Sequence, residues 1–169
     1  MNYDWTSFTK RITINSSVEK IYTMWATTAG LEQWFLRMAT YSNSDGNKRT
    51  ANELIDVGDE FCWRWHGWPD STQEKGTVLE ANGKDFLKFS FGQEGAEGMI
   101  CTIKIYSEEN ETICEMFQQN IPTDEKGMTH FHIGCMTGWL FYMTNLKSIL
   151  EGGIDLRNKN GSIKNLINS

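Results

Sequence analysis

Apolar residues recur at intervals of three and four near the end of the chain, and this pattern predicts one long helix. From Met128 to Glu151 the sequence has no proline, and it then reaches Gly152-Gly153. The spacing places apolar side chains on one helix face, and a glycine supplies the positive φ that ends a helix. The residues of this face are Met136, Trp139, Leu140, Met143, Leu146, Ile149 and Leu150.

The middle of the chain is predicted to form β-strands. The candidate strands are 59–66, 74–81, 85–92, 98–107 and 111–120. Turn residues separate them, and the Asn82-Gly83 pair is a strong hairpin signal. Because the connections are short, consecutive strands should be antiparallel.

Alternating apolar and polar residues near the start predict another strand, over 8–14. Ser16 and Glu19 then match a capping box, so a helix is expected over 17–26. Residues 28–30 should break the chain before a second short helix over 31–35. The pattern weakens over the next twenty residues, where a turn cluster separates short strands.

This order of elements predicts a single α+β domain over 1–169, with a core at about 8–156 and a polar tail at 157–169. A chain of 169 residues can bury about 70% of its unfolded surface. The long helix needs cover for its apolar face. The concave side of a curved antiparallel sheet of six to seven strands would provide it and leave room for a cavity.

Charge and composition limit the kinds of partner and environment that we expect for this protein. The formal charge of −6 argues against nucleic acid, which binds concentrated Lys and Arg. The longest apolar run, 139–143, is far shorter than the roughly 20 residues that span a bilayer, and no secretory signal is recognisable, so a cytoplasmic protein without membrane insertion is expected. Four dispersed cysteines are expected to be reduced, with a disulfide or zinc site as the alternative. The sequence leaves monomer or homodimer open.

Large apolar side chains are abundant and suggest a ligand pocket. Strand 59–66 places Phe61, Trp63 and Trp65 on one face, which should turn toward the long helix. The predicted pocket residues are Trp63, Trp65, Glu115, Phe117, Met136, Trp139 and Met143. Among these, Glu115 would orient a ligand, or else form a salt bridge with Lys88 or Lys104 at the sheet edge. The aromatic residues are equally suited to a solid core.

No pattern points to a metal, a cofactor or catalysis. His130 and His132 diverge on a helix, although an extended segment could bring them together with His66. The sequence contains no nucleophile elbow, phosphate-binding glycine loop or dinucleotide fingerprint. We therefore expect no cofactor and a non-enzymatic protein.

The ordered set of elements resembles the START-like (Bet v 1-like, SRPBCC, helix-grip) superfamily. Within it, the chain is similar to the C-terminal domain of the activator of Hsp90 ATPase. The residues that carry this likeness are 12–22, Trp25, 34–35, 58–61, 76–80, 87–91 and 138–156.

This resemblance implies a helix-grip fold with a cavity for a small apolar or amphipathic molecule, such as a lipid, sterol or polyketide. It also implies two alternatives: an Hsp90 co-chaperone-type interaction module, and a polyketide cyclase-like enzyme. A cyclase needs polar groups inside its cavity, for which Arg64, His66, Tyr106 and Glu115 are the candidates. The prediction is non-enzymatic ligand binding between the sheet and the C-terminal helix.

Overall fold

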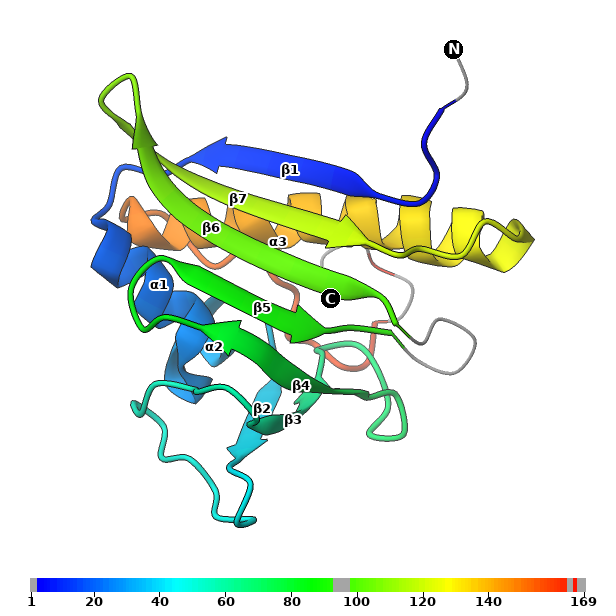
Figure 1. Cartoon of the computed structure of the whole chain (residues 1–169), viewed down its shortest axis with the longest axis horizontal. Coiled ribbons are helices and arrows are strands. Elements are labelled where there is room, and N and C mark those ends of the chain that lie inside the picture. Colours follow the sequence, from blue (N-terminus) through cyan, green and yellow to red (C-terminus); the bar gives the residue numbers. More distant parts are fainter. Residues whose placement is uncertain (1–2, 93–97, 164–165, 167–169) are drawn as a thin grey trace.

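A seven-stranded antiparallel sheet and a long C-terminal helix organise the molecule, which is described here from a computed structural model (Figure 1). The structure describes residues 3–92, 98–163 and 166. The strand order is β1-β7-β6-β5-β4-β3-β2, and every neighbouring pair is antiparallel. The predicted α+β helix-grip fold is confirmed.

The six strands whose bounds were predicted lie within two residues of their expected ends, and β2 lies in the region where the pattern was weak. They are β1 (Phe8–Thr13), β2 (Met38–Ser42), β3 (Glu60–Arg64), β4 (Glu74–Ala81), β5 (Phe86–Ser90), β6 (Ile100–Glu108) and β7 (Glu111–Gln119). Short connections make β3 to β7 consecutive neighbours in the sheet. The first strand closes the far side by pairing with β7, from Phe8 opposite Gln118 to Thr13 opposite Ile113.

Two short helices, α1 (Val18–Ala26) and α2 (Thr28–Trp34), follow β1. The N-cap of α1 is Ser17, whose hydroxyl accepts from the Lys20 amide, so the predicted Ser16 cap was one residue early. The predicted break at 28–30 was also wrong. Those residues form the first turn of α2, because the Thr27 hydroxyl caps it by accepting from the Gly30 amide at 2.9 Å.

The long C-terminal helix has two parts. A π-helical segment, η1 (Gly127–Gly134), leads directly into α3 (Cys135–Leu150). Gly152 has a φ of +80°, which confirms the predicted glycine stop. In Figure 1, α3 lies along one face of the sheet. No helix in the described residues is long and apolar enough to cross a membrane.

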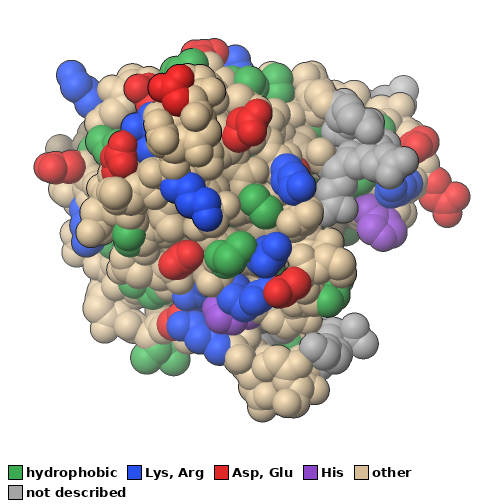
Figure 2. All heavy atoms as spheres, turned by 90° about the horizontal axis from the view of Figure 1, so that it is seen from below, with side chains coloured by type: hydrophobic (Ala, Val, Ile, Leu, Met, Phe, Trp, Pro, Cys, Tyr) green, Lys and Arg blue, Asp and Glu red, His purple; other side chains and the backbone are tan. Residues whose placement is uncertain are grey.

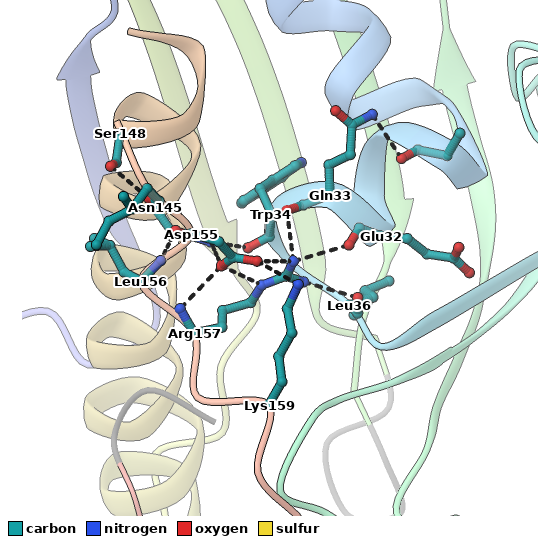
Figure 3. Close-up of polar contacts among 12 residues, drawn as sticks. Glu32, Gln33, Trp34, Leu36, Asn145, Ser148, Asp155, Leu156, Arg157 and Lys159 are labelled. Atoms are coloured by element: carbon teal, nitrogen blue, oxygen red, sulfur yellow. Dashed lines mark hydrogen bonds and ion pairs between the residues drawn. The ribbon is translucent and has the colours of Figure 1, made fainter. Parts of the chain in front are cut away.

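The segment after α3 is fastened to α2, far away in sequence (Figure 3). The Arg157 guanidinium donates to the carbonyls of Glu32, Gln33 and Leu36, with its Nη2 2.6 Å from the Gln33 oxygen. Asn145, completely buried in α3, donates to the Trp34 carbonyl at 2.7 Å. These side chains satisfy carbonyls that the end of α2 leaves without intrahelical partners. They fix α3 against α2.

Alternation along β7 decides which of its side chains meet the helix. Cys114, Met116 and Gln118 are completely buried, and Gln118 accepts a hydrogen bond from the Trp139 indole of α3 at 2.9 Å. Because neighbouring side chains on a strand point to opposite faces, Glu115 and Phe117 lie on the other face of the sheet. Their predicted position in a pocket under α3 was therefore wrong.

Candidate functional site

An apolar pocket of about 130 Å³ opens between α3 and the β3 and β5 ends of the sheet. Its lining residues are Phe35, Trp65, Phe91, Cys135, Gly138, Trp139 and Tyr142. Phe35 follows α2, Trp65 and Phe91 follow β3 and β5, and the other four belong to α3. The site therefore depends on how the C-terminal helix docks onto the sheet.

Aromatic contacts hold the walls of this pocket in place. The Phe35 ring lies 5.0 Å from Trp139 and 4.8 Å from Tyr142, measured between ring centroids. Phe91 lies 5.8 Å from Trp139 on the opposite wall. Edge-to-face and tilted pairs at such distances are favourable beyond the area they bury. The walls are thus a continuation of the aromatic core and are already in place.

Gly138 forms part of the pocket wall and has no structural need to be glycine. A Cβ added there would meet no atom within 4 Å, and no positive φ is recorded for this residue. Glycine inside a helix costs about 0.5–1 kcal/mol relative to alanine. The missing side chain leaves open space beside the pocket.

Polar groups lie in the interior close to the apolar walls. Gln118 accepts from the Trp139 indole and from the Cys101 thiol, at 2.9 and 3.7 Å. Glu74 is only 3% exposed, and the Gly92 amide donates to its Oε1 at 2.7 Å. Burial raises the pKa of the Glu74 carboxyl to about 7, against the opposing effect of that hydrogen bond. A proton thus binds in the interior near neutral pH.

The two ionisable groups on the pocket wall hold their protons firmly. Burial raises the pKa of the Cys135 thiol to about 11 and that of the Tyr142 phenol to about 12. Both are therefore neutral at physiological pH. The wall offers a neutral apolar surface to whatever enters.

A family model described as Activator of Hsp90 ATPase homolog 1-like protein matches residues 15–151. The chain belongs to this family. The match runs from just after β1 to just past the end of α3, and so includes every residue that lines the apolar pocket. A search of curated proteins found no match.

Solved structures share the fold of this family member at low sequence identity. The Aha1 dimer from Colwellia psychrerythraea has 21% identity and a TM-score of 0.68, with 87% of this chain and 97% of that chain covered. Protein SSP2350 from Staphylococcus saprophyticus has 13% identity and a TM-score of 0.66, with coverages of 89% and 96%. CalU16 from Micromonospora echinospora has 15% identity and a TM-score of 0.64, with coverages of 88% and 76%.

The predicted site residues of this family member are divided between three places. Trp65 and Trp139 line the pocket. Trp63 and Met143 are each 1% exposed and belong to the core, against which Met136 packs while half-buried. Glu115 and Phe117 lie on the opposite sheet face, where Glu115 accepts from the Tyr106 hydroxyl at 2.8 Å and lies 3.5 Å from Arg11. The salt-bridge partner of Glu115 is thus Arg11, whereas Lys88 or Lys104 was expected.

Sequence reasoning missed several residues of the site. A glycine in the middle of a predicted amphipathic helix was a usable signal for Gly138, because neither a cap nor a turn is needed there. Phe35 gave no comparable signal, since it comes from a separate segment that only the tertiary fold brings to the pocket. Glu74 looked like any charged residue at the start of a strand.

The histidines do not form a metal site. His132 is completely buried, its Nε2 lies 2.8 Å from the Tyr3 hydroxyl and its Nδ1 lies 3.0 Å from the Trp5 carbonyl. No group of three or more metal-ligating side chains occurs within the described ranges 3–92, 98–163 and 166. All four cysteines are free thiols.

Proposed function

We propose that this protein is a non-enzymatic binding protein whose pocket under α3 takes an apolar group, of about one aromatic ring, from a small amphipathic molecule. The observation that carries this proposal is Gly138, a helix-interior glycine that borders the pocket and is required by no neighbouring atom. A cavity of about 150 Å³ with apolar walls is known to hold benzene. The pocket volume of about 130 Å³ is similar.

The chemistry of the walls supports binding over catalysis. General acids and bases work best when their pKa lies near the working pH. Cys135 and Tyr142, the ionisable groups of the wall, have pKa values raised to about 11 and 12. Glu74 has a suitable pKa but is not among the residues that line the pocket. These features favour holding an apolar group without transforming it.

A titration with 3-phenylpropan-1-ol, followed by NMR of the tryptophan indole N–H signals, tests the proposal. We expect the Trp65 and Trp139 signals to shift with saturation. The variant Gly138→Leu should abolish the shifts, because its side chain fills the space that the ring needs. Gly134→Leu is the matched control, since Gly134 is exposed at the start of α3 and lies outside the pocket. Unchanged binding by Gly138→Leu would refute the assignment of the pocket.

Binding to an Hsp90-type chaperone is a second candidate, suggested by the family description and by an exposed apolar strip. Ile133 and Leu140 are 46% and 55% exposed on the outer side of the C-terminal helix, seven residues apart. Exposed apolar groups of this kind can mark a protein contact. Calorimetry with purified Hsp90 would test it: Leu140→Lys should remove any binding, whereas Gly138→Leu should not.

A further inference from the structure

A second hollow, of about 230 Å³, is lined partly by residues next in sequence to those of the apolar pocket and has the opposite character. Its lining residues are Arg37, His66, Gly67, Trp68, Asp70, Lys159 and Gly161. Charged and aromatic groups predominate here, and Trp68 is 57% exposed. Figure 2 shows a face of the molecule on which Lys and Arg side chains gather beside a His.

The two hollows are joined through the chain itself. Phe35 of the apolar pocket is two residues from Arg37, and Trp65 directly precedes His66. The Arg37 Nε also donates to the Trp65 carbonyl at 3.2 Å. The charge of Arg157 affects both sides, because it lowers the pKa of His66 and opposes the burial effect on Tyr142. The two hollows are thus lined by residues close together along the chain, and both lie within the influence of the Arg157 charge.

Positive charge is in excess in the ion-pair network around this second hollow, although the whole chain has a formal charge of −6. Ion pairs in the described part of the chain connect four cations with two carboxylates: Arg37, Arg64, Arg157 and Lys159 with Asp70 and Asp155. Burial and the nearby cations, Arg157 foremost, lower the pKa of His66, so the imidazole is neutral at pH 7 and adds no charge. Two positive charges remain uncompensated.

The carboxylate of Asp70 contacts two arginines of this cluster. Its Oδ1 lies 2.5 Å from Arg37 Nη2, and its Oδ2 lies 3.6 Å from Arg64 Nη1. The Asp70 side chain is nevertheless 71% exposed, so it is held by these cations and little else. The buried Nε of Arg64 has no hydrogen-bond partner in the described structure. Guanidinium groups are suited to carboxylates and phosphates, and these two are oriented toward one carboxylate already.

We propose that the Arg37–Arg64–Lys159 cluster binds the anionic group, a carboxylate, of the same small molecule whose apolar end enters the pocket under α3. This inference rests on the proposed function and narrows its ligand to an anionic amphiphile with a short spacer. Asp70 serves as an internal competitor that holds the guanidinium groups in position until the ligand carboxylate displaces it. Trp68, exposed beside the cluster, covers the spacer.

A matched pair of probes tests the charge requirement: 3-phenylpropanoate and the uncharged 3-phenylpropan-1-ol, each titrated by NMR into the wild type at low salt. The anion should bind at least threefold more tightly. Asp70→Asn should strengthen binding of the anion by at least a further threefold, because the competitor is gone, and leave the alcohol unchanged. Arg37→Gln should weaken anion binding by at least threefold.

Two charge-matched controls separate a local site from the effect of net charge. Glu80 and Lys88 form an ion pair on β4 and β5, outside the cluster. Glu80→Gln changes the charge as Asp70→Asn does, and Lys88→Gln changes it as Arg37→Gln does. Neither control should change the affinity for the anion by more than the small effect of a distant surface charge that is screened by salt.

The outcomes distinguish the inference from the proposed function. Equal affinities for the two probes, unchanged by Asp70→Asn, would overturn the anion site and leave the apolar pocket standing. Equal strengthening by Asp70→Asn and Glu80→Gln would likewise overturn it, since only net charge would then matter. Failure of both probes to bind would overturn both ideas. Tight anion binding that survives Gly138→Leu would overturn the link between the two hollows.

Discussion

Replacing Glu74 with glutamine should stabilise this protein at alkaline pH and have little effect at acidic pH. The Glu74 carboxyl is 3% exposed and has a folded-state pKa of about 7, raised by burial from an ordinary value of 4.5. At pH values below 4.5 the acid is protonated in both states, so folding is not penalised. As pH rises toward 7 the unfolded chain ionises first, and stability falls.

The magnitude follows from the size of this shift. One pKa unit corresponds to 1.36 kcal/mol, so a carboxyl raised from 4.5 to about 7 destabilises the folded protein by up to about 3 kcal/mol above pH 7. Glutamine keeps an Oε1 that can accept from the Gly92 amide, and it cannot ionise. The difference in free energy of unfolding between Glu74→Gln and the wild type should therefore increase by about 3 kcal/mol from pH 4.5 to pH 8.

Urea unfolding at pH 5, 6, 7 and 8 measures this dependence directly. The quantity to compare is the difference in free energy of unfolding between Glu74→Gln and the wild type at each pH. Glu111→Gln, at an exposed position at the start of β7, is the control and should give a flat difference. If the Glu74→Gln difference also changes by less than about 0.5 kcal/mol across this range, the carboxyl is not held in a low-dielectric interior and the reasoning fails.

Three further substitutions test the packing. Gly138→Ala should raise the free energy of unfolding by up to about 1 kcal/mol, and by at least as much as Gly134→Ala in the same helix; a loss would mean that the glycine is needed for packing. Trp139→Ala should cost about 3–5 kcal/mol by urea unfolding, because Trp139 is 3% exposed and bonded to the core; a cost below about 1 kcal/mol would contradict that placement. Arg49→Met should cost about 3 kcal/mol by thermal unfolding, because Asp59 would stay buried without its bidentate partner; adding Asp59→Asn should recover much of this loss.

Periodicity predicted the fold because the elements are long and strongly patterned. The β4 strand begins and ends at the residues expected, and Gly152 ends the last helix as its position suggested. Helix starts were less certain, because several neighbouring hydroxyls compete for one cap. Ser17 rather than Ser16 accepts from Lys20, and Thr27 begins a helix where a break was expected.

The sheet face was harder to assign than the strand. On β7 the two alternating sets each contain three residues with one polar member: Ile113, Glu115 and Phe117 on one face, Cys114, Met116 and Gln118 on the other. Side-chain size favours placing the set that contains phenylalanine toward the helix. The register with β1 places Glu115 opposite Arg11 and so sends that set outward. A hydrogen bond from α3 to Gln118 fixes the choice, and no local pattern contains that information.

The size of the apolar pocket limits how tightly a single-ring probe can bind. Fully burying a side chain the size of phenylalanine is worth about 1.5–3 kcal/mol, and a partly exposed ion pair adds about 0–1 kcal/mol. Their sum approaches, but does not exceed, the roughly 4 kcal/mol that corresponds to a Kd of 1 mM. We therefore expect 3-phenylpropanoate to bind in the millimolar range, which is why the titrations are followed by NMR. A micromolar Kd would require the ligand to bury far more apolar area than a pocket of about 130 Å³ can cover. Such a result would show that α3 moves away from the sheet on binding and that the natural ligand is larger than one ring.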